Sequence, residues 1–327
     1  MSDTDPMSIA HIAFSHYPID TIGVEFLRHN ENLTYKITGA DEQRHLLRIH
    51  KPVTQAFHMM PMSSALLESE LLWLEALACD TNIKVQTPVR NRFNKLVTQI
   101  ADGSPLFCTM LNWVDGEGML IDTPEAPNLM SELGELIAGL HSNAGKWAPP
   151  PGFIRPSYDA ERFHTVVEIL RESVEMGILT SDELELMEET AKQAVTEMVA
   201  LRKTTGSWGL IHADISPGNL LVSDGVLMPI DFSLCGFGPY AWDLGSGLAN
   251  FPSDLRKYTL EAYCNLRPLP ADHLRLMEGC CVLGILSCFA FNLQNPAKLE
   301  WLHRRMPMSV DREWKRYLRG ESFFFEI

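Results

Sequence analysis

Three oxygen-bearing side chains flank a short hairpin pattern in the second half of the sequence. Asp214 and Asn219 come before two apolar runs, residues 220–222 and 226–230, and Asp231 follows the second run directly. The runs are separated by Ser-Asp-Gly, and an Asp-Gly pair is a strong signal for a tight hairpin turn. Because a hairpin brings its two ends together, we expect these three side chains to converge.

The chemistry of these side chains favours a magnesium site. Carboxylate and amide oxygens are hard ligands that suit Mg²⁺ rather than Zn²⁺. Magnesium commonly takes only one or two protein carboxylates and completes its shell with water and phosphate oxygens. A second aspartate then remains available as a base. Metal ligands and a base beside an acceptor hydroxyl are the parts that phosphoryl transfer requires.

The same stretch resembles a known family, and the resemblance extends over most of the chain. His212, Asp214 and Asn219 form the pattern His-x-Asp-x-x-x-x-Asn, and the next motif, at Asp231, reads Asp-Phe-Ser. These patterns resemble the motifs of kinase-like phosphotransferases, in particular the branch of aminoglycoside phosphotransferases and choline kinases. Ala213 stands where that branch usually has glycine. A metal-hydrolase His-x-Asp pair is the alternative, but no second His/Asp cluster supports it.

The resemblance implies a role for each matched residue. Asp214 resembles the catalytic base that orients or deprotonates the acceptor hydroxyl, and Asn219 and Asp231 resemble the Mg²⁺ ligands. His212 resembles a structural residue that supports the catalytic loop. Asp243 resembles a buried carboxylate that holds the same loop through backbone N–H groups, and capping of the following helix is its alternative role.

The first third of the sequence predicts the elements that would position a nucleotide. Three short β-like runs between residues 24 and 50, joined by polar turns, predict an antiparallel meander. A helix capped by Ser63 or Ser64 follows. Glu70 lies within the apolar face of that helix, where a carboxylate is costly unless a cation pairs with it. We therefore expect a basic partner on a strand beneath, with snorkelling to water as the alternative.

Arg48, on the third run, stands where the resemblance places the cation that pairs with the helix glutamate and contacts nucleotide phosphates. Most kinases have lysine there, and arginine offers a forked geometry instead. Lys51 ranks second because it follows the strand and precedes proline. The phosphate-covering turn has no Gly-x-Gly, so Asn30 and Asn32 are the expected contacts. The resemblance places adenine between the lobes, near a hinge that begins at Asn112.

Together these patterns predict an α+β protein with a bilobal, protein-kinase-like fold. The small N-terminal lobe, residues 1–114, would be an antiparallel β-sheet with one helix that binds nucleotide. The larger, mainly helical lobe, residues 115–327, would carry the catalytic hairpin and the acceptor site. Thr180 and Glu183 form a capping box that should open a long acidic helix.

Charge and composition exclude several partners. The chain of 327 residues has 27 Lys and Arg against 42 Asp and Glu, a net charge of −15. Nucleic-acid binders need a basic footprint, and anionic membrane surfaces are equally disfavoured. The most apolar run, residues 280–291, is short of the roughly 20 residues that a membrane span needs. An acidic N-terminus and an odd number of cysteines without metal spacing favour the cytoplasm.

The sequence therefore predicts an ATP- (or GTP-) and Mg²⁺-dependent kinase that phosphorylates a hydroxyl of a small molecule. A cationic aminoglycoside is one candidate acceptor, for which Glu321 and Glu326 are candidate contacts, although solubility also explains the acidity. Choline, ethanolamine, homoserine, a sugar or a macrolide are alternatives. A bacterial protein kinase is disfavoured because the stretch from Asp231 to Asp243 is too short for an activation loop. A nucleotide-binding module without turnover is the remaining alternative.

Overall fold

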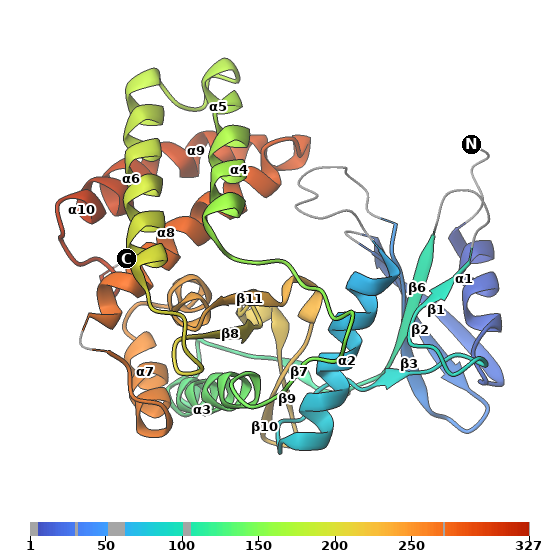
Figure 1. The fold of residues 1–327 in the computed structure, drawn as a ribbon. Coiled ribbons are helices and arrows are strands. Elements are labelled where there is room, and N and C mark those ends of the chain that lie inside the picture. The colour runs from blue at the N-terminus through green and yellow to red at the C-terminus, as the bar shows by residue number, and fades with distance from the viewer. Residues whose placement is uncertain (1–5, 30–31, 52–62, 101–105, 271, 327) are drawn as a thin grey trace. The chain divides into compact units, whose positions relative to one another are not determined.

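The computed structural model describes residues 6–29, 32–51, 63–100, 106–270 and 272–326 (Figure 1). The chain forms two compact units. The first comprises Met1–Gly116 together with Ala148–Ile154, and the second comprises Glu117–Trp147 together with Arg155–Ile327. The mixed α+β class expected from the sequence is confirmed, since a sheet dominates the first unit and helices dominate the second.

The first unit is built on one antiparallel sheet in the order β1-β2-β3-β6-β4, with β5 also paired to β6. Its strands are β1 (Thr21–His29), β2 (Leu33–Gly39), β3 (Arg44–Ile49), β4 (Pro88–Val89), β5 (Thr98–Gln99) and β6 (Phe107–Asn112). The first three strands are the predicted meander. Side chains alternate across a strand, so Leu47 and Met110, which are register partners, share one face of the sheet.

Two helices accompany this sheet. Helix α1 (Pro6–Ser15) is labelled in Figure 1, and the sequence pattern did not indicate it. It buries Ile9 and Ala13 in a core with Leu47 and Met110. Helix α2 (Ser64–Asp80) begins as predicted after Ser63, whose hydroxyl accepts the N–H of Leu66. An N-cap of this kind satisfies one of the unpaired N–H groups at a helix start.

The second unit consists mainly of helices around short strands. The helices are α3 (Ala126–Ala144), α4 (Ala160–Leu170), α5 (Glu172–Glu175), α6 (Ser181–Ala200), α7 (Arg256–Leu266), α8 (His273–Asn292), α9 (Leu299–Ser309) and α10 (Lys315–Leu318). The strands are β7 (Glu117–Gly118), β8 (Trp208–Ile211), β9 (Leu220–Ser223), β10 (Val226–Pro229) and β11 (Gly236–Pro239). Helix α6 opens with the predicted capping box of Thr180 and Glu183.

The predicted hairpin is present as β9 and β10, with Val226 paired to Ser223. Asp224 and Gly225 between them have φ of 51° and 72°, the left-handed values that a tight hairpin turn requires. Strand β7 pairs with β9, and β11 pairs separately with β8. These short ladders fix both ends of the segment that contains the candidate catalytic residues.

Helices α3 and α7 pack closely in the second unit. A Cβ on Gly134 of α3 would overlap the carbonyl oxygen of Thr259 on α7, so glycine permits this approach. The packing places His141 of α3 within hydrogen-bond distance of Tyr263 of α7. Both side chains belong to the polar network described below.

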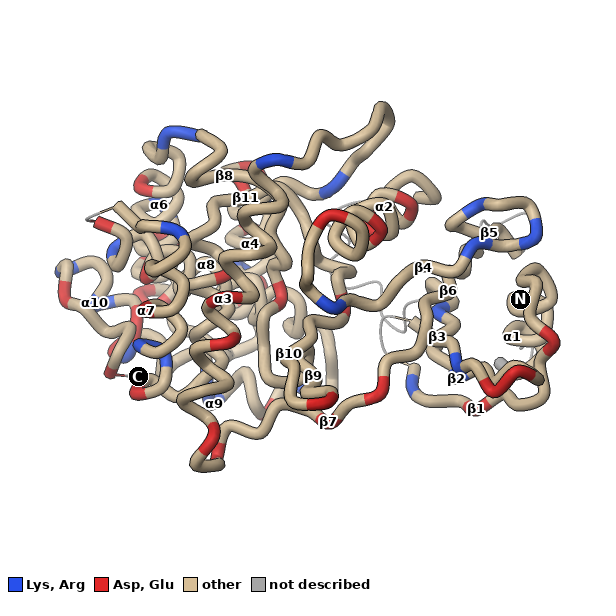
Figure 2. Tube along the Cα trace, turned by 90° about the horizontal axis from the view of Figure 1, so that it is seen from below, with Lys and Arg blue, Asp and Glu red and all other residues tan. Residues whose placement is uncertain are grey.

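Helix α8 is long and apolar enough to cross a membrane by length and composition, but 56% of its apolar window is buried within the protein. A core helix of a globular protein passes the same test, so this helix is weak evidence for a membrane span. Within the helices and strands, acidic residues lie on β1 and α2 of the first unit and on β7 and α3 to α9 of the second, with basic residues among them (Figure 2). This distribution fits a solvated acidic surface.

Candidate active site

The β9–β10 hairpin brings the candidate catalytic residues together. The amide nitrogen of Asn219 donates to the Oδ2 of Asp214 at 2.6 Å and to the carbonyl of the same residue at 2.9 Å. The N–H of Ile230, the residue before Asp231, donates to the carbonyl of Asn219 at 2.9 Å. Asp214 and Asn219 therefore meet, and the backbone contact of Ile230 places Asp231 directly after the same point of the chain.

The amide of Asn219 suits the metal-ligand role that the sequence implied. Because its nitrogen donates a hydrogen bond to Asp214, its oxygen is the atom that remains to bind a metal. Among the residues that the structure describes, no group of three or more His, Cys, Asp or Glu is placed to hold a metal ion. One amide and one carboxylate, Asp231, instead fit Mg²⁺, which takes most of its remaining ligands from water and phosphate.

Two residues of the site adopt a left-handed backbone. Ala213 has φ of 68° and Asp231 has φ of 62°. This conformation costs a non-glycine residue roughly 1 kcal/mol and is found where the surrounding structure enforces it. It also explains why glycine is the usual residue at the Ala213 position in the similar branch, because glycine adopts this conformation without a penalty.

Asp243 holds the start of the candidate catalytic loop, residues 212–219. Its Oδ2 accepts the N–H of His212 at 2.9 Å, and its Oδ1 accepts the N–H of Ala213 at 2.8 Å. The Oδ2 also accepts Nε2 of His141 at 3.1 Å, and the Nδ1 of that histidine meets the hydroxyl of Tyr263 at 3.0 Å. Asp243 and His141 are both fully buried, at 0% exposure.

This network has one consistent protonation pattern. Burial lowers the pKa of His141, which outweighs the opposing hydrogen bond to Asp243, so the imidazole is neutral. Burial raises the pKa of Asp243, but hydrogen bonds from His141 and from the backbone of His212 bring the net pKa below its ordinary value. Burial raises the pKa of Tyr263 to about 12. The tyrosine therefore donates to a neutral histidine, which donates to an ionised aspartate.

His212 bridges the two sides of the hairpin. Its Nε2 lies 3.1 Å from the carbonyl of Ile230, and its Nδ1 accepts the N–H of Asp214 at 3.3 Å. Its ring packs against Phe232 with centroids 4.5 Å apart. Because both ring nitrogens bond to the backbone, this geometry fits a structural residue better than a proton-transfer group.

Sequence reasoning missed two residues beside this site. Arg155 donates to the carbonyls of Cys235 at 2.7 Å and Ser233 at 2.5 Å, and Tyr158 donates to the carbonyl of Leu234 at 2.8 Å. These three carbonyls follow the turn that begins at the candidate metal-ligand aspartate. Their partners lie nearly 80 residues earlier in the chain, so no local signal could have found them.

In the first unit, Glu70 has the basic partner that the sequence predicted. The Nη1 of Arg48 lies 2.8 Å from the Oε1 of Glu70, and the two side chains are only 6% and 2% exposed. The Nε of Arg48 donates to the hydroxyl of Thr109 on β6. Lys51, the second candidate, is exposed and lies after β3.

One other expected nucleotide contact, Asn112, faces away from this pair. Asn112 is the register partner of His45, and Arg48 that of Thr109, so Asn112 and Arg48 point to opposite faces of the sheet. The amide of Asn112 bonds to Thr87 and His45. Asn32 is half-buried before β2, and its amide oxygen has no hydrogen-bond partner among the described residues. Asn30 lies outside the described residues.

The two acidic candidates near the C-terminus have cationic neighbours of their own. Glu326 pairs with Arg316 at 2.5 Å, and Glu321 lies 3.9 Å from Arg319. Both carboxylates are more than half exposed, and their role in acceptor binding stays a prediction.

Comparisons with known proteins agree with this geometry. The chain is 25% identical over 240 residues to amicoumacin kinase of Bacillus subtilis (strain 168). That match covers 73% of this chain and 66% of the relative, just under two thirds of its length. A microcompartment-associated aminopropanol kinase is similar in structure, with a TM-score of 0.76 at 24% identity over 97% of this chain and 99% of the other.

An amicoumacin kinase in complex with AMP-PNP, Ca²⁺ and Ami has a TM-score of 0.77 at 18% identity, over 98% of this chain and 95% of the other. At this level of identity the two structures demonstrate a shared fold. The model of the phosphotransferase enzyme family matches residues 23–277, well over half of the sequence. The chain therefore belongs to the phosphotransferase enzyme family.

Proposed function

We propose that the protein is a kinase that transfers the γ-phosphoryl group of ATP to a hydroxyl group of a small molecule, with Mg²⁺ as its metal. The observation that carries this proposal is the 2.6 Å hydrogen bond from Asn219 to Asp214. It fixes the carboxylate of a base directly beside an amide that can bind a metal. Phosphoryl transfer depends chiefly on such positioning and on charge stabilisation.

Asp214 is the proposed base. Its carboxylate accepts the proton of the acceptor hydroxyl as that oxygen bonds to the γ-phosphorus and the bond to the β-phosphate oxygen breaks. The products are the phosphorylated acceptor and ADP. Asp243 acts on this step indirectly, because it fixes the backbone of His212 and Ala213 just before the base.

Asn219 and Asp231 are the proposed ligands of the metal, which would neutralise charge on the phosphate oxygens when bound. Arg48 is the proposed phosphate contact from the first unit. Glu70 fixes the guanidinium of Arg48 in one orientation by their buried ion pair. Arginine at this position can bind phosphate oxygens in a forked manner that lysine cannot.

The relatives suggest which acceptors to test first. An aminopropanol kinase is among the proteins of similar fold, and aminopropanol is a small amino alcohol that is cationic at neutral pH. Amicoumacin is the acceptor named for the curated relative. A chain with a net charge of −15 attracts cations over long range. We therefore place amino alcohols first, amicoumacin second and aminoglycosides third.

An acceptor screen tests this function. Purified protein is mixed with Mg²⁺-ATP and, in turn, 1-amino-2-propanol, amicoumacin, an aminoglycoside, a sugar or a macrolide, and ADP release is measured. We expect one acceptor to stimulate ADP release and Asp214→Ala to reduce that release by about 100-fold or more. Nucleotide binding without stimulation by any acceptor would favour a non-catalytic module. Labelled protein bands from lysate with labelled ATP would favour a protein kinase.

A further inference from the structure

A buried glutamate of α8 holds the segment before the C-terminus. The Oε1 of Glu278 accepts the hydroxyl of Ser322 at 2.7 Å and the N–H groups of Phe323 at 2.8 Å and Phe324 at 3.2 Å. Both phenylalanine side chains are fully buried. Three donors on one oxygen offset the cost of burying this carboxyl group, so residues 322–324 have a fixed backbone.

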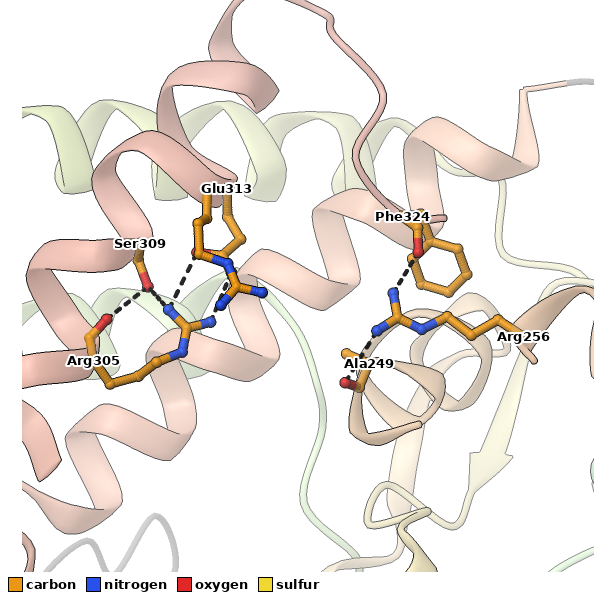
Figure 3. Close-up of polar contacts among 7 residues, drawn as sticks. Ala249, Arg256, Arg305, Ser309, Glu313 and Phe324 are labelled. Carbon is orange, nitrogen blue, oxygen red and sulfur yellow. Dashed lines mark hydrogen bonds and ion pairs between the residues drawn. The ribbon is translucent and has the colours of Figure 1, made fainter. Parts of the chain in front are cut away.

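Arg256, at the start of α7, connects this segment to the interior. Its Nη1 donates to the carbonyl of Phe324, its Nε to that of Phe251 at 3.0 Å and its Nη2 to that of Ala249 at 3.3 Å. Figure 3 shows the guanidinium between Phe324 and Ala249. A planar group with five donors can satisfy three carbonyls at once. Arg256 therefore joins the C-terminal segment to the chain around residue 250.

Asn250 lies between those two carbonyls in sequence and reaches the catalytic loop. Its amide nitrogen donates to the carbonyl of Ile215 at 3.0 Å, and also to that of Gly247 at 3.1 Å. Ile215 directly follows Asp214. The stretch from Asp243 to Asn250 thus holds the loop on both sides of the base, because its first residue binds the N–H groups of residues 212 and 213.

We propose that Arg256 and Asn250 are positioning residues for the catalytic loop, and that residues 322–324 brace the loop through them. The proposal rests on the proposed function, since it assigns these residues to the orientation of the same base. Neither residue touches the reacting atoms. Loss of either bond should let residues 212–216 move and should lower the rate of the chemical step.

The second unit contains a matched control. Arg305 donates to the hydroxyl of Ser309 at 2.5 Å and to the Oε1 of Glu313 at 2.6 Å, and Glu313 is buried (Figure 3). These contacts stay within α9 and the turn Val310–Trp314 that follows it. Loss of Arg305 therefore removes a partly buried arginine network without touching residues 243–250.

The test compares Arg256→Gln, Asn250→Ala and the control Arg305→Gln in the full chain. The first readout is hydrogen–deuterium exchange of the peptide that spans residues 210–216, with no acceptor or nucleotide. We expect exchange of its protected amides to be at least about tenfold faster in Arg256→Gln and Asn250→Ala, and unchanged in Arg305→Gln. Because the side chain of Asn250 is exposed, its variant should fold even if Arg256→Gln does not.

The second readout is kinetic and uses whichever acceptor stimulates ADP release. We expect kcat to fall about tenfold or more in Arg256→Gln and Asn250→Ala, with KM for ATP changed less than about twofold, because misplaced catalytic groups reduce rate rather than nucleotide affinity. Unchanged exchange in Asn250→Ala, or equal effects in Arg305→Gln, would overturn the proposal. Exchange needs no turnover, so it tests whether Arg256 and Asn250 hold residues 210–216 in place separately from the proposed kinase activity.

Discussion

The two units bury charge in different ways. In the first unit, Arg48 and Glu70 form an ion pair between a strand and a helix. In the second unit, the carboxylate of Asp243 is bound by two backbone N–H groups and a neutral histidine, His141. The ion pair depends on a charged side-chain partner that a single substitution can remove. The second arrangement depends on where the loop backbone lies, because Asp243 binds the N–H groups of His212 and Ala213 just before Asp214, the proposed base.

The largest effect on stability should come from breaking the ion pair. Glu70→Gln leaves Arg48 charged and buried, and removal of one partner from such a pair costs about 3–5 kcal/mol of unfolding free energy. Urea denaturation measures this cost. Glu75→Gln on the same helix is the control, because the pair of Glu75 with Arg90 is about one third exposed and should contribute at most about 1 kcal/mol. Equal losses in the two variants would contradict the account of Arg48.

A smaller loss of stability, with a selective loss of rate, should follow from Asp243→Asn. The asparagine can still accept one backbone N–H, but it must turn a donor toward the other. The loop then shifts, and misplacement of about 1 Å can cost on the order of 100-fold in kcat. KM for ATP should change little, whereas Glu70→Gln should raise it. Steady-state kinetics of the two variants measure this difference. An equal rise of KM for ATP in Asp243→Asn and Glu70→Gln would contradict the comparison.

The smallest effect is the pH dependence of stability, which should differ between the two units. Burial, reinforced by the charge of Arg48, lowers the pKa of His50 well below 6.5, whereas burial of His141 is opposed by Asp243. Below about pH 6.5 the unfolded chain binds protons at these histidines and the folded protein does not. The free energy of unfolding should therefore decrease as the pH is lowered below about 6.5, by at most about 1.4 kcal/mol per pH unit for each histidine.

Thermal denaturation between pH 7.5 and 5 tests this dependence. The decrease of Tm between pH 7.5 and 5 should be reduced more by His50→Gln than by His141→Gln. Asp243 does not contribute in this range, because its folded pKa lies below 3.8 and its stabilising effect is lost only as pH falls through that lower value. A Tm that is independent of pH from 7.5 to 5 would contradict the neutral, buried state of both histidines.

Local signals in the sequence were enough for the central parts of the site. The Asp-Gly turn predicted the hairpin, and the spacing around it predicted the meeting of Asp214 and Asn219. The position of Glu70 on an apolar face predicted a buried cation partner. Each of these inferences used periodicity or turn chemistry within about 20 residues, where the chain itself limits the possible geometry.

The rest depended on long-range contacts to backbone carbonyls, which have no sequence signature. Arg155, Asn250 and Arg256 all bond to carbonyls, and every residue type has one. Asn112 was expected at the nucleotide, and this stays a prediction; its side chain lies on the face of the sheet opposite Arg48. Helix α1 was missed because its exposed face carries Ile12 beside Ser8, His11 and Ser15 and has no Lys, Arg, Asp or Glu, so its helical period is weak in the sequence.

The central claim is that Asp214 is the base of a phosphoryl transfer. Its most direct test measures Mg²⁺-ATP affinity by calorimetry and acceptor-dependent ADP release on the same samples of wild type, Asp214→Asn and Asp224→Asn. Asp224 is an exposed residue at the turn of the same hairpin, and asparagine tolerates its left-handed backbone.

We predict that both variants bind Mg²⁺-ATP within about threefold of wild type. ADP release should be lower by a factor on the order of 10²–10⁴ in Asp214→Asn and unchanged in Asp224→Asn. Wild-type ADP release in Asp214→Asn would contradict the account.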